Sequence, residues 1–226
     1  VWHYEHHFNI DEHYPYPINY KHPYCETKAL SEKLLIEQIN QGEISGGILR
    51  PCWVWGPGDN VVLPKLLELV LDNKLFLIGK GDNNISICYV ENLTETMVKM
   101  GEIGELKSVI YFIHAGHKIT LYEFLNRMFN EQNIKWEPKT ISYSLAYGIA
   151  YICELYSRVN QYRSQPLITR YVVSVLNRNL EYSIYKACNE LGYMPIKSFK
   201  EGLRELKLWV DSTGGVSELV RCSNIQ

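Results

Sequence analysis

Pro23-Tyr24-Cys25-Glu26-Thr27-Lys28 opens a segment that continues to Asn40 with no further glycine or proline. Proline is common at the first position of a helix, so we predict a helix from Pro23 to about Asn40. Tyr24 and Lys28 would lie one turn apart on one face of that helix. A phenol is a poor acid-base group at neutral pH, and a cation held beside it favours the phenolate. The pair is a candidate proton-exchange site, although this spacing alone more often marks a half-buried tyrosine beside a solvated lysine.

Helix and strand patterns alternate on both sides of this segment. The first twenty residues show no periodicity and are expected to form a loop. Gly47 to Trp55 has the apolar character of one buried strand, and Gly56-Pro57-Gly58-Asp59 is a turn cluster. Further strands are expected at 74–78, 85–90 and 109–114, and helices at 62–71, 92–100 with Asn92 as its cap, 121–130 with Thr120 as its cap, 142–159, 168–176, 183–191 and 198–210. This alternation predicts an α/β fold with a mainly parallel sheet, followed by a helix-rich second half.

Composition excludes several classes of protein. The 226 residues are 46% hydrophobic and 21% charged with a net charge of −2, which is ordinary for a globular protein and gives no reason to expect nucleic-acid binding. The six cysteines contain no Cys-x-x-Cys pair, which predicts neither a disulfide framework nor structural zinc. The longest apolar stretch, Tyr143–Tyr156, is shorter than the roughly 20 residues that span a bilayer. We expect a cytoplasmic protein, with peripheral membrane contact as a less favoured alternative.

Several segments together resemble the extended short-chain dehydrogenase/reductase family. The matching stretches are Tyr24-x-x-x-Lys28-Ala29-x-x-Glu32, Arg50-Pro51 with Trp55-Gly56-Pro57-Gly58-Asp59, Ile78-Gly79-x-Gly81, Tyr89-Val90-Glu91-Asn92-Leu93, and Lys186-Ala187 with Leu191-Gly192-Tyr193-x-Pro195. They follow the family's order along nearly the whole chain. Within the family, the sequence is most similar to the branch of 3β-hydroxysteroid dehydrogenases and sterol-4α-carboxylate 3-dehydrogenases.

This resemblance implies an architecture. The chain would be the C-terminal part of a Rossmann-type doubly wound parallel sheet plus a smaller, helix-rich α/β substrate-binding subdomain. Residues 1–60 would belong to the NAD(P)-binding domain, with some later segments returning to it. Residues 61–212 would form mainly the substrate-binding subdomain, and residues 213–226 a flexible tail.

The resemblance also implies a reaction. An NAD(P)-dependent oxidoreductase would oxidise a secondary alcohol, in this branch the 3β-hydroxyl of a steroid or sterol. Tyr24 would exchange the proton, and Lys28 would hydrogen-bond the nicotinamide ribose. The main chain of Pro51, Cys52, Trp53 and Val54 would face the nicotinamide. The helix that carries Tyr24 commonly forms a dimer face in this family, which leaves a homodimer open.

Two features of the family are missing from the sequence. No Gly-x-x-Gly-x-x-Gly stands between a strand and a helix, and no candidate catalytic serine or threonine precedes Tyr24. Both would lie before Val1, so we expect a catalytically incomplete fragment that is inactive alone. The choice between NAD and NADP would be made in the same missing part.

A nucleotide-sugar epimerase or dehydratase of the same superfamily is the alternative enzyme. Its substrate would need a cationic residue for the pyrophosphate. The candidates are Arg127, Arg158, Arg163, Arg170 and Arg178.

Three other groups of residues have both a functional and a structural interpretation. His3, His6, His7, Asp11, Glu12 and His13 are of the types that bind divalent metals, but they lack helical register, and we predict no metal site. The pair His114 and His117 follows a predicted strand and is expected to be structural. Tyr143, Tyr147, Tyr151 and Tyr156 recur at helical spacing, which favours a core stripe over the wall of an apolar substrate pocket.

Overall fold

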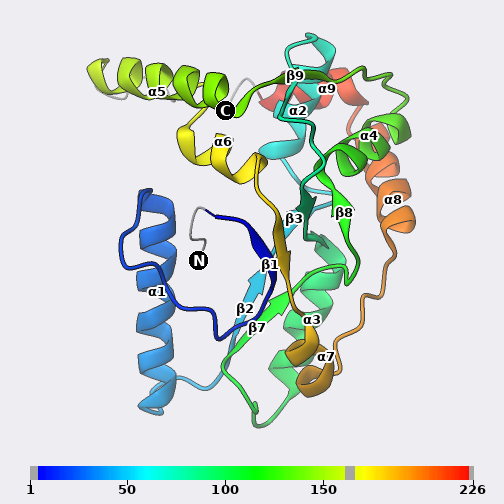
Figure 1. The fold of residues 1–226 in the computed structure, drawn as a ribbon. Coiled ribbons are helices and arrows are strands. Elements are labelled where there is room, and N and C mark those ends of the chain that lie inside the picture. The colour runs from blue at the N-terminus through cyan, green and yellow to red at the C-terminus, as the bar shows by residue number, and fades with distance from the viewer. Residues whose placement is uncertain (1–4, 161–165, 224–226) are drawn as a thin grey trace. The chain divides into compact units, whose positions relative to one another are not determined.

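The computed structural model describes residues 5–160 and 166–223 and divides them between two compact units. Unit 1 combines Val1–Gly56, Ser86–Lys118 and Glu181–Gly202, and unit 2 combines Pro57–Ile85, Ile119–Leu180 and Leu203–Gln226. His3 lies outside the described residues. Each unit is therefore built from segments that are distant in the sequence, as the mixed colours of Figure 1 show.

Unit 1 contains the helix of Tyr24 and Lys28 beside short parallel strands (Figure 1). Its elements are β1 (His7–Ile10), α1 (Pro23–Asn40), β2 (Ile48–Pro51), β3 (Trp53–Trp55), β6 (Ile87–Tyr89), α3 (Val90–Glu102), β7 (Ile110–Ile113) and α7 (Tyr185–Leu191). β2 pairs in parallel with β7, and β3 pairs in parallel with β6. The core of unit 1 joins these strands to α7 through Cys88, Tyr111, Ile113, Ala187, Leu191 and Tyr193.

Unit 2 is richer in helices. Its elements are α2 (Val62–Leu71), β4 (Phe76–Ile78), β5 (Asn84–Ile85), β8 (Ile119–Thr120), α4 (Leu121–Glu131), β9 (Lys139–Ile141), α5 (Tyr143–Val159), α6 (Arg170–Leu176) and α9 (Val216–Ser223). β4 pairs in parallel with β9, and β5 pairs antiparallel with β8. β10 (Leu180–Tyr182) and α8 (Phe199–Ser212) each begin in one unit and end in the other.

Helix starts were predicted well where a cap is local. α1 begins at Pro23, with the His22 ring accepting a hydrogen bond from the Tyr24 N–H. The Thr120 hydroxyl caps α4, as predicted. Asn92 does not cap α3, because that helix already begins at Val90. The buried Asn92 amide instead makes two hydrogen bonds to the main chain of Lys197.

Three further expectations differ from the structure. The single strand over Gly47–Trp55 is two strands, because the chain changes partners at Cys52. The Cys52 N–H donates to the carbonyl of Ile113, in β7. The N–H of the next residue, Trp53, donates to the carbonyl of Ser86, just before β6. The N-terminal segment contains β1, with His7 fully buried, where a loop was expected. Residues 213–226 include helix α9, whose Leu219 is buried, where a flexible tail was expected.

The tyrosine stripe of α5 was also misread. Tyr147, Tyr151 and Tyr156 are 36%, 51% and 67% exposed, so they are no core stripe. The buried positions of α5 are instead the small residues Ala146, Ala150 and Ser157. Small side chains let this helix approach its neighbours closely, which turns the larger side chains outward. No described helix is long and apolar enough to cross a membrane.

Candidate functional site

α1 places the two predicted catalytic side chains together at the surface of unit 1. The Lys28 Nζ lies 5.8 Å from the centroid of the Tyr24 ring, and Tyr24 is 53% exposed. Cys25 and Ala29 follow the pair by one residue each and are buried at 3% and 0% exposure. Neighbouring residues of a helix point in directions about 100° apart around its axis. Burial of Cys25 and Ala29 therefore leaves Tyr24 and Lys28 at the edge of the buried face. The packing of α1 therefore fixes the backbone of Tyr24 and Lys28, while their side chains remain accessible to solvent.

Lys28 is also electrostatically available. Its ammonium forms no ion pair with any residue that the structure describes. Many other lysines differ: Lys65 bonds Glu68, Lys74 bonds Asp72, and Lys118 bonds Glu181. An ammonium without a carboxylate keeps its donors for hydroxyl groups, and its charge stays next to the Tyr24 phenol.

A buried ion pair fastens α1 to the neighbouring strand β2. Arg50 makes two hydrogen bonds to Glu32, from Nε at 2.8 Å and from Nη2 at 2.6 Å. The Tyr16 hydroxyl donates to the same carboxylate, and the Arg50 guanidinium lies 5.2 Å from the Phe112 ring centroid. Glu32 and Arg50 belong to two separate motifs of the sequence, and the structure shows that these motifs are bonded to each other.

The pKa values of this cluster follow from burial and from its internal hydrogen bonds. Burial raises the pKa of Glu32, but the bonds from Arg50 and Tyr16 outweigh burial, so its pKa lies below the ordinary value. Burial and the hydrogen bond to Glu32 raise the pKa of Tyr16 to about 12. Tyr16 therefore remains a neutral donor, while Glu32 remains charged.

The segment Pro51–Val54 lies at the end of β2 and in β3 of the same unit. Pro51 is the last residue of β2, and Val54 is registered with Cys88 of β6. Burial raises the pKa of the Cys52 thiol, which favours the protonated form over the nucleophilic thiolate. The ends of parallel strands are where ligands of open α/β sheets bind. The role of these residues toward the nicotinamide remains a prediction.

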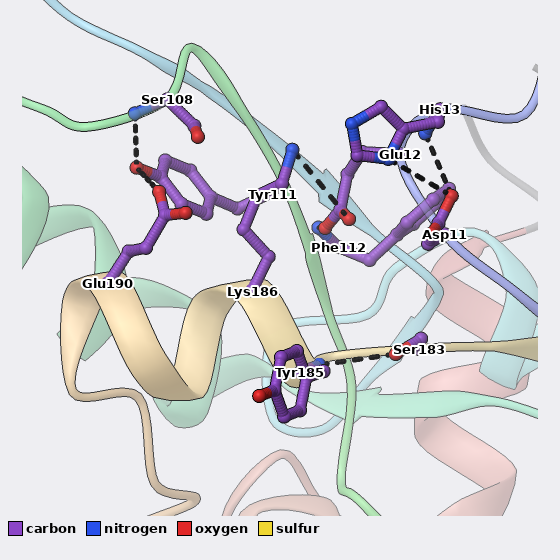
Figure 2. A network of polar contacts seen from close by, with 10 residues as sticks. All are labelled: Asp11, Glu12, His13, Ser108, Tyr111, Phe112, Ser183, Tyr185, Lys186 and Glu190. Carbon is purple, nitrogen blue, oxygen red and sulfur yellow. Dashed lines mark hydrogen bonds and ion pairs between the residues drawn. The ribbon is translucent and has the colours of Figure 1, made fainter.

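A network of polar contacts holds the N-terminal segment against β7 and α7 (Figure 2). The Glu12 carboxylate is buried; it accepts a hydrogen bond of 2.7 Å from the Phe112 N–H and lies 4.0 Å from the Lys186 Nζ. Beside it, Asp11 accepts from the His13 N–H, which lowers the pKa of Asp11. Glu12, one of the residues that suggested metal binding, is thus committed to main-chain and lysine contacts. No three His, Cys, Asp or Glu side chains in the described ranges gather as a metal site.

His114 has a structural environment in unit 1. Its Nε2 lies 2.8 Å from the Tyr182 carbonyl, and its Nδ1 accepts from the Gly116 N–H. These partners assign the proton to Nε2 of a neutral ring. Burial lowers the pKa of His114, in agreement with that state. The Tyr193 hydroxyl donates to the His114 carbonyl, after Gly192 has ended α7 in a left-handed conformation. Leu191-Gly192-Tyr193 therefore serves packing in this chain.

Comparison with known proteins places these motifs in a family. The model of the "3-beta hydroxysteroid dehydrogenase/isomerase family" matches residues 2–142. A "2-alkyl-3-oxoalkanoate reductase" of Stenotrophomonas maltophilia is 31% identical over 85% of this chain and 59% of its own length. A "3beta-hydroxysteroid-dehydrogenase/decarboxylase isoform 1" of Arabidopsis thaliana is 30% identical over 87% of this chain and 47% of its own. The chain thus spans about half of the length of these relatives.

Solved structures confirm the expected fold class. A dTDP-glucose 4,6-dehydratase from Bacillus anthracis, solved in complex with NAD, has a TM-score of 0.64 at 16% identity. The match covers 92% of this chain and 58% of the dehydratase chain. A UDP-glucose 4-epimerase from Thermotoga maritima has a TM-score of 0.61 at 19% identity, over 84% of this chain and 54% of its own. The α/β fold with parallel strands is that of the Rossmann-type extended short-chain dehydrogenases/reductases.

Proposed function

The chain belongs to the 3-beta hydroxysteroid dehydrogenase/isomerase family, and from that premise we propose an NAD(P)-dependent oxidation of a secondary alcohol, the 3β-hydroxyl of a steroid or sterol. The observation that carries the proposal is the exposed Tyr24 phenol beside a Lys28 ammonium that has no carboxylate partner in the described residues. The relatives named for reduction or oxidation at a 3-oxo or 3β-hydroxyl position support this chemistry. Because the chain covers only part of those relatives, the activity is proposed for the whole protein that carries it.

The residues of unit 1 fit a nicotinamide cofactor. Lys28 would hold the ribose hydroxyls with its uncommitted ammonium, and the main chain at Pro51–Val54 would border the nicotinamide ring. When bound, the cofactor supplies the acceptor for the hydride. Tyr24 takes the hydroxyl proton as the alcohol is oxidised and returns it in the reverse direction. The positive charge of Lys28 stabilises the phenolate in either direction.

The substitution Tyr24→Phe tests this assignment in the protein that carries the chain. Loss of the phenol removes the proton acceptor, and we expect turnover of a 3β-hydroxysteroid to fall by about 10²- to 10⁴-fold. Formation of reduced nicotinamide, followed by absorbance, measures the rate with NAD and NADP in parallel. Cofactor binding, followed by fluorescence, should stay near the parent value.

Tyr185→Phe is the matched control, because Tyr185 is 77% exposed at the start of α7, and it should retain full activity. Undiminished turnover in Tyr24→Phe would remove Tyr24 as the acid-base residue. A parent protein that turns over UDP-glucose, and no 3β-hydroxysteroid, would replace the proposal by the nucleotide-sugar alternative. That alternative is supported by the fold shared with the dehydratase and the epimerase.

A further inference from the structure

Arg178 of unit 2 has a donor that no described residue satisfies. It follows α6, whose last turn ends at the cap residue Asn177. The guanidinium carbon lies 5.0 Å from the centroid of the Tyr143 ring. The Nε atom is buried and makes no hydrogen bond with the described residues. A buried donor without an acceptor is unfavourable, and one on a cation is more so.

The other described arginines do not share this combination. Four of them bind a carboxylate: Arg50 with Glu32, Arg127 with Glu123, Arg170 with Glu154 and Arg221 with Glu218. Arg158 and Arg204 are exposed, so water satisfies their charge. Arg178 is only half-exposed, and it forms no ion pair with the described residues. Residues 5–160 and 166–223 therefore supply no counter-ion for the Arg178 guanidinium.

The surroundings of Arg178 are held in place. Tyr143 packs against the buried cluster of unit 2 that contains Ile78 and Ala146, and its hydroxyl lies 3.3 Å from Ser174 Oγ. On the main-chain side, the Arg178 carbonyl accepts a 2.9 Å hydrogen bond from the Asn83 side chain. The guanidinium is thus supported on one face and anchored at its backbone, which lowers the entropy lost when a ligand binds.

We infer that Arg178 binds an oxyanion, the carboxylate or phosphate group of a small molecule. A guanidinium fork matches both groups, and partial burial strengthens a charge-assisted hydrogen bond. Stacking on Tyr143 and the carbonyl end of α6 both favour a cation, but neither gives the Nε–H an acceptor. The proposed oxidation of a hydroxyl needs no anionic group, so this inference adds a second recognition element to the substrate or to a separate ligand.

Nuclear magnetic resonance of the Arg178 Nε–H group tests the inference directly in the isotope-labelled protein. Sodium acetate, inorganic phosphate and sodium chloride are titrated at matched ionic strength. We expect acetate or phosphate to shift the Arg178 signal to saturation, while chloride leaves it in place. The Arg170 Nε–H is the internal control, because it already donates to Glu154 at 2.7 Å and should not move.

Two variants extend the test to the binding constant. The nuclear magnetic resonance signal of the Gly79 backbone amide can follow anion binding in these variants. Gly79 lies next to Asn177, the residue before Arg178: a Cβ built at Gly79 would be 3.0 Å from Asn177 Oδ1. Arg178→Gln should raise the dissociation constant of the anion at least tenfold. Arg204→Gln, the exposed control, should leave that constant unchanged. If Arg178→Gln fails to fold, the wild-type titration decides alone.

An Arg178 signal that ignores both anions, or follows chloride equally, overturns the inference. Tighter binding of acetate identifies a carboxylate ligand, and tighter binding of phosphate a phosphorylated one. Neither result depends on turnover. An inactive protein that binds the anion refutes the oxidation alone, and an active protein that does not bind it refutes only the role of Arg178.

Discussion

At the scale of single residues, some charged groups of unit 1 form ion pairs and others form none with the described residues. Glu32 and Arg50 form an ion pair with two hydrogen bonds, and their side chains are only 10% and 12% exposed. Lys28 forms no ion pair with the residues that the structure describes, and it lies beside the only phenol of α1. The Glu32–Arg50 pair holds α1 to β2, and the Lys28 ammonium stays available for the role that we propose for it.

Glu32→Gln should destabilise the protein by about 3 kcal/mol, because it leaves the Arg50 charge buried without a partner. Chemical denaturation measures the loss as a change in the free energy of unfolding. The exposed pair of Arg127 and Glu123 provides the control: Glu123→Gln should cost less than about 1 kcal/mol. Equal losses in the two variants would contradict the assigned importance of burial.

At the scale of elements, local signals were sufficient for most helices and insufficient for contacts between segments. The proline at the start of α1 and the threonine before α4 act within one turn, so the sequence shows them. The bond between Glu32 and Arg50, and that between Asn92 and Lys197, join residues that are 18 and 105 positions apart. No spacing rule identifies such partners. The short strands β1, β9 and β10 were missed for the same reason, since strand pairing is set by distant segments.

The end of β7 should make stability depend on pH through His114. Above pH 6.5, the ordinary histidine value, the ring is neutral in both the folded and the unfolded states. As pH falls below that value, the unfolded state takes up a proton that the buried ring resists, so stability decreases until the lowered folded pKa is reached. Between about pH 7.5 and about pH 5, the free energy of unfolding should fall more in the parent than in His114→Gln. Denaturation curves at each pH measure the difference, and parallel profiles would exclude His114 as the cause.

At the scale of the whole molecule, neither unit is a continuous piece of chain. The core of unit 1 combines Tyr111 and Ile113 of β7 with Ala187, Leu191 and Tyr193 from 70 or more positions later. The chain therefore leaves unit 1 and returns to it twice before that core is complete. This interleaving means that no single pair of limits along the sequence can describe either unit.

A fragment that ends at Lys118 should fail to fold cooperatively, because it lacks α7 and with it half of the core cluster of unit 1. A chain that joins residues 1–56, 86–118 and 181–202 by short glycine-serine linkers should fold. Its second junction joins Lys118 to Glu181, whose side chains form an ion pair of 2.6 Å. Thermal unfolding followed by near-ultraviolet circular dichroism measures both. A cooperative transition in the shorter fragment would show that unit 1 does not need its last segment.

The carboxylate of Glu12 has a consequence for association between molecules. β7 pairs with β2 on one side, and on its other side the Phe112 N–H is taken by Glu12. An unpaired strand amide is a template on which another chain can add a strand, and a negative charge at that place repels it. We therefore expect Glu12 to oppose the pairing of β7 with a strand of another molecule, in addition to holding the N-terminal segment in place.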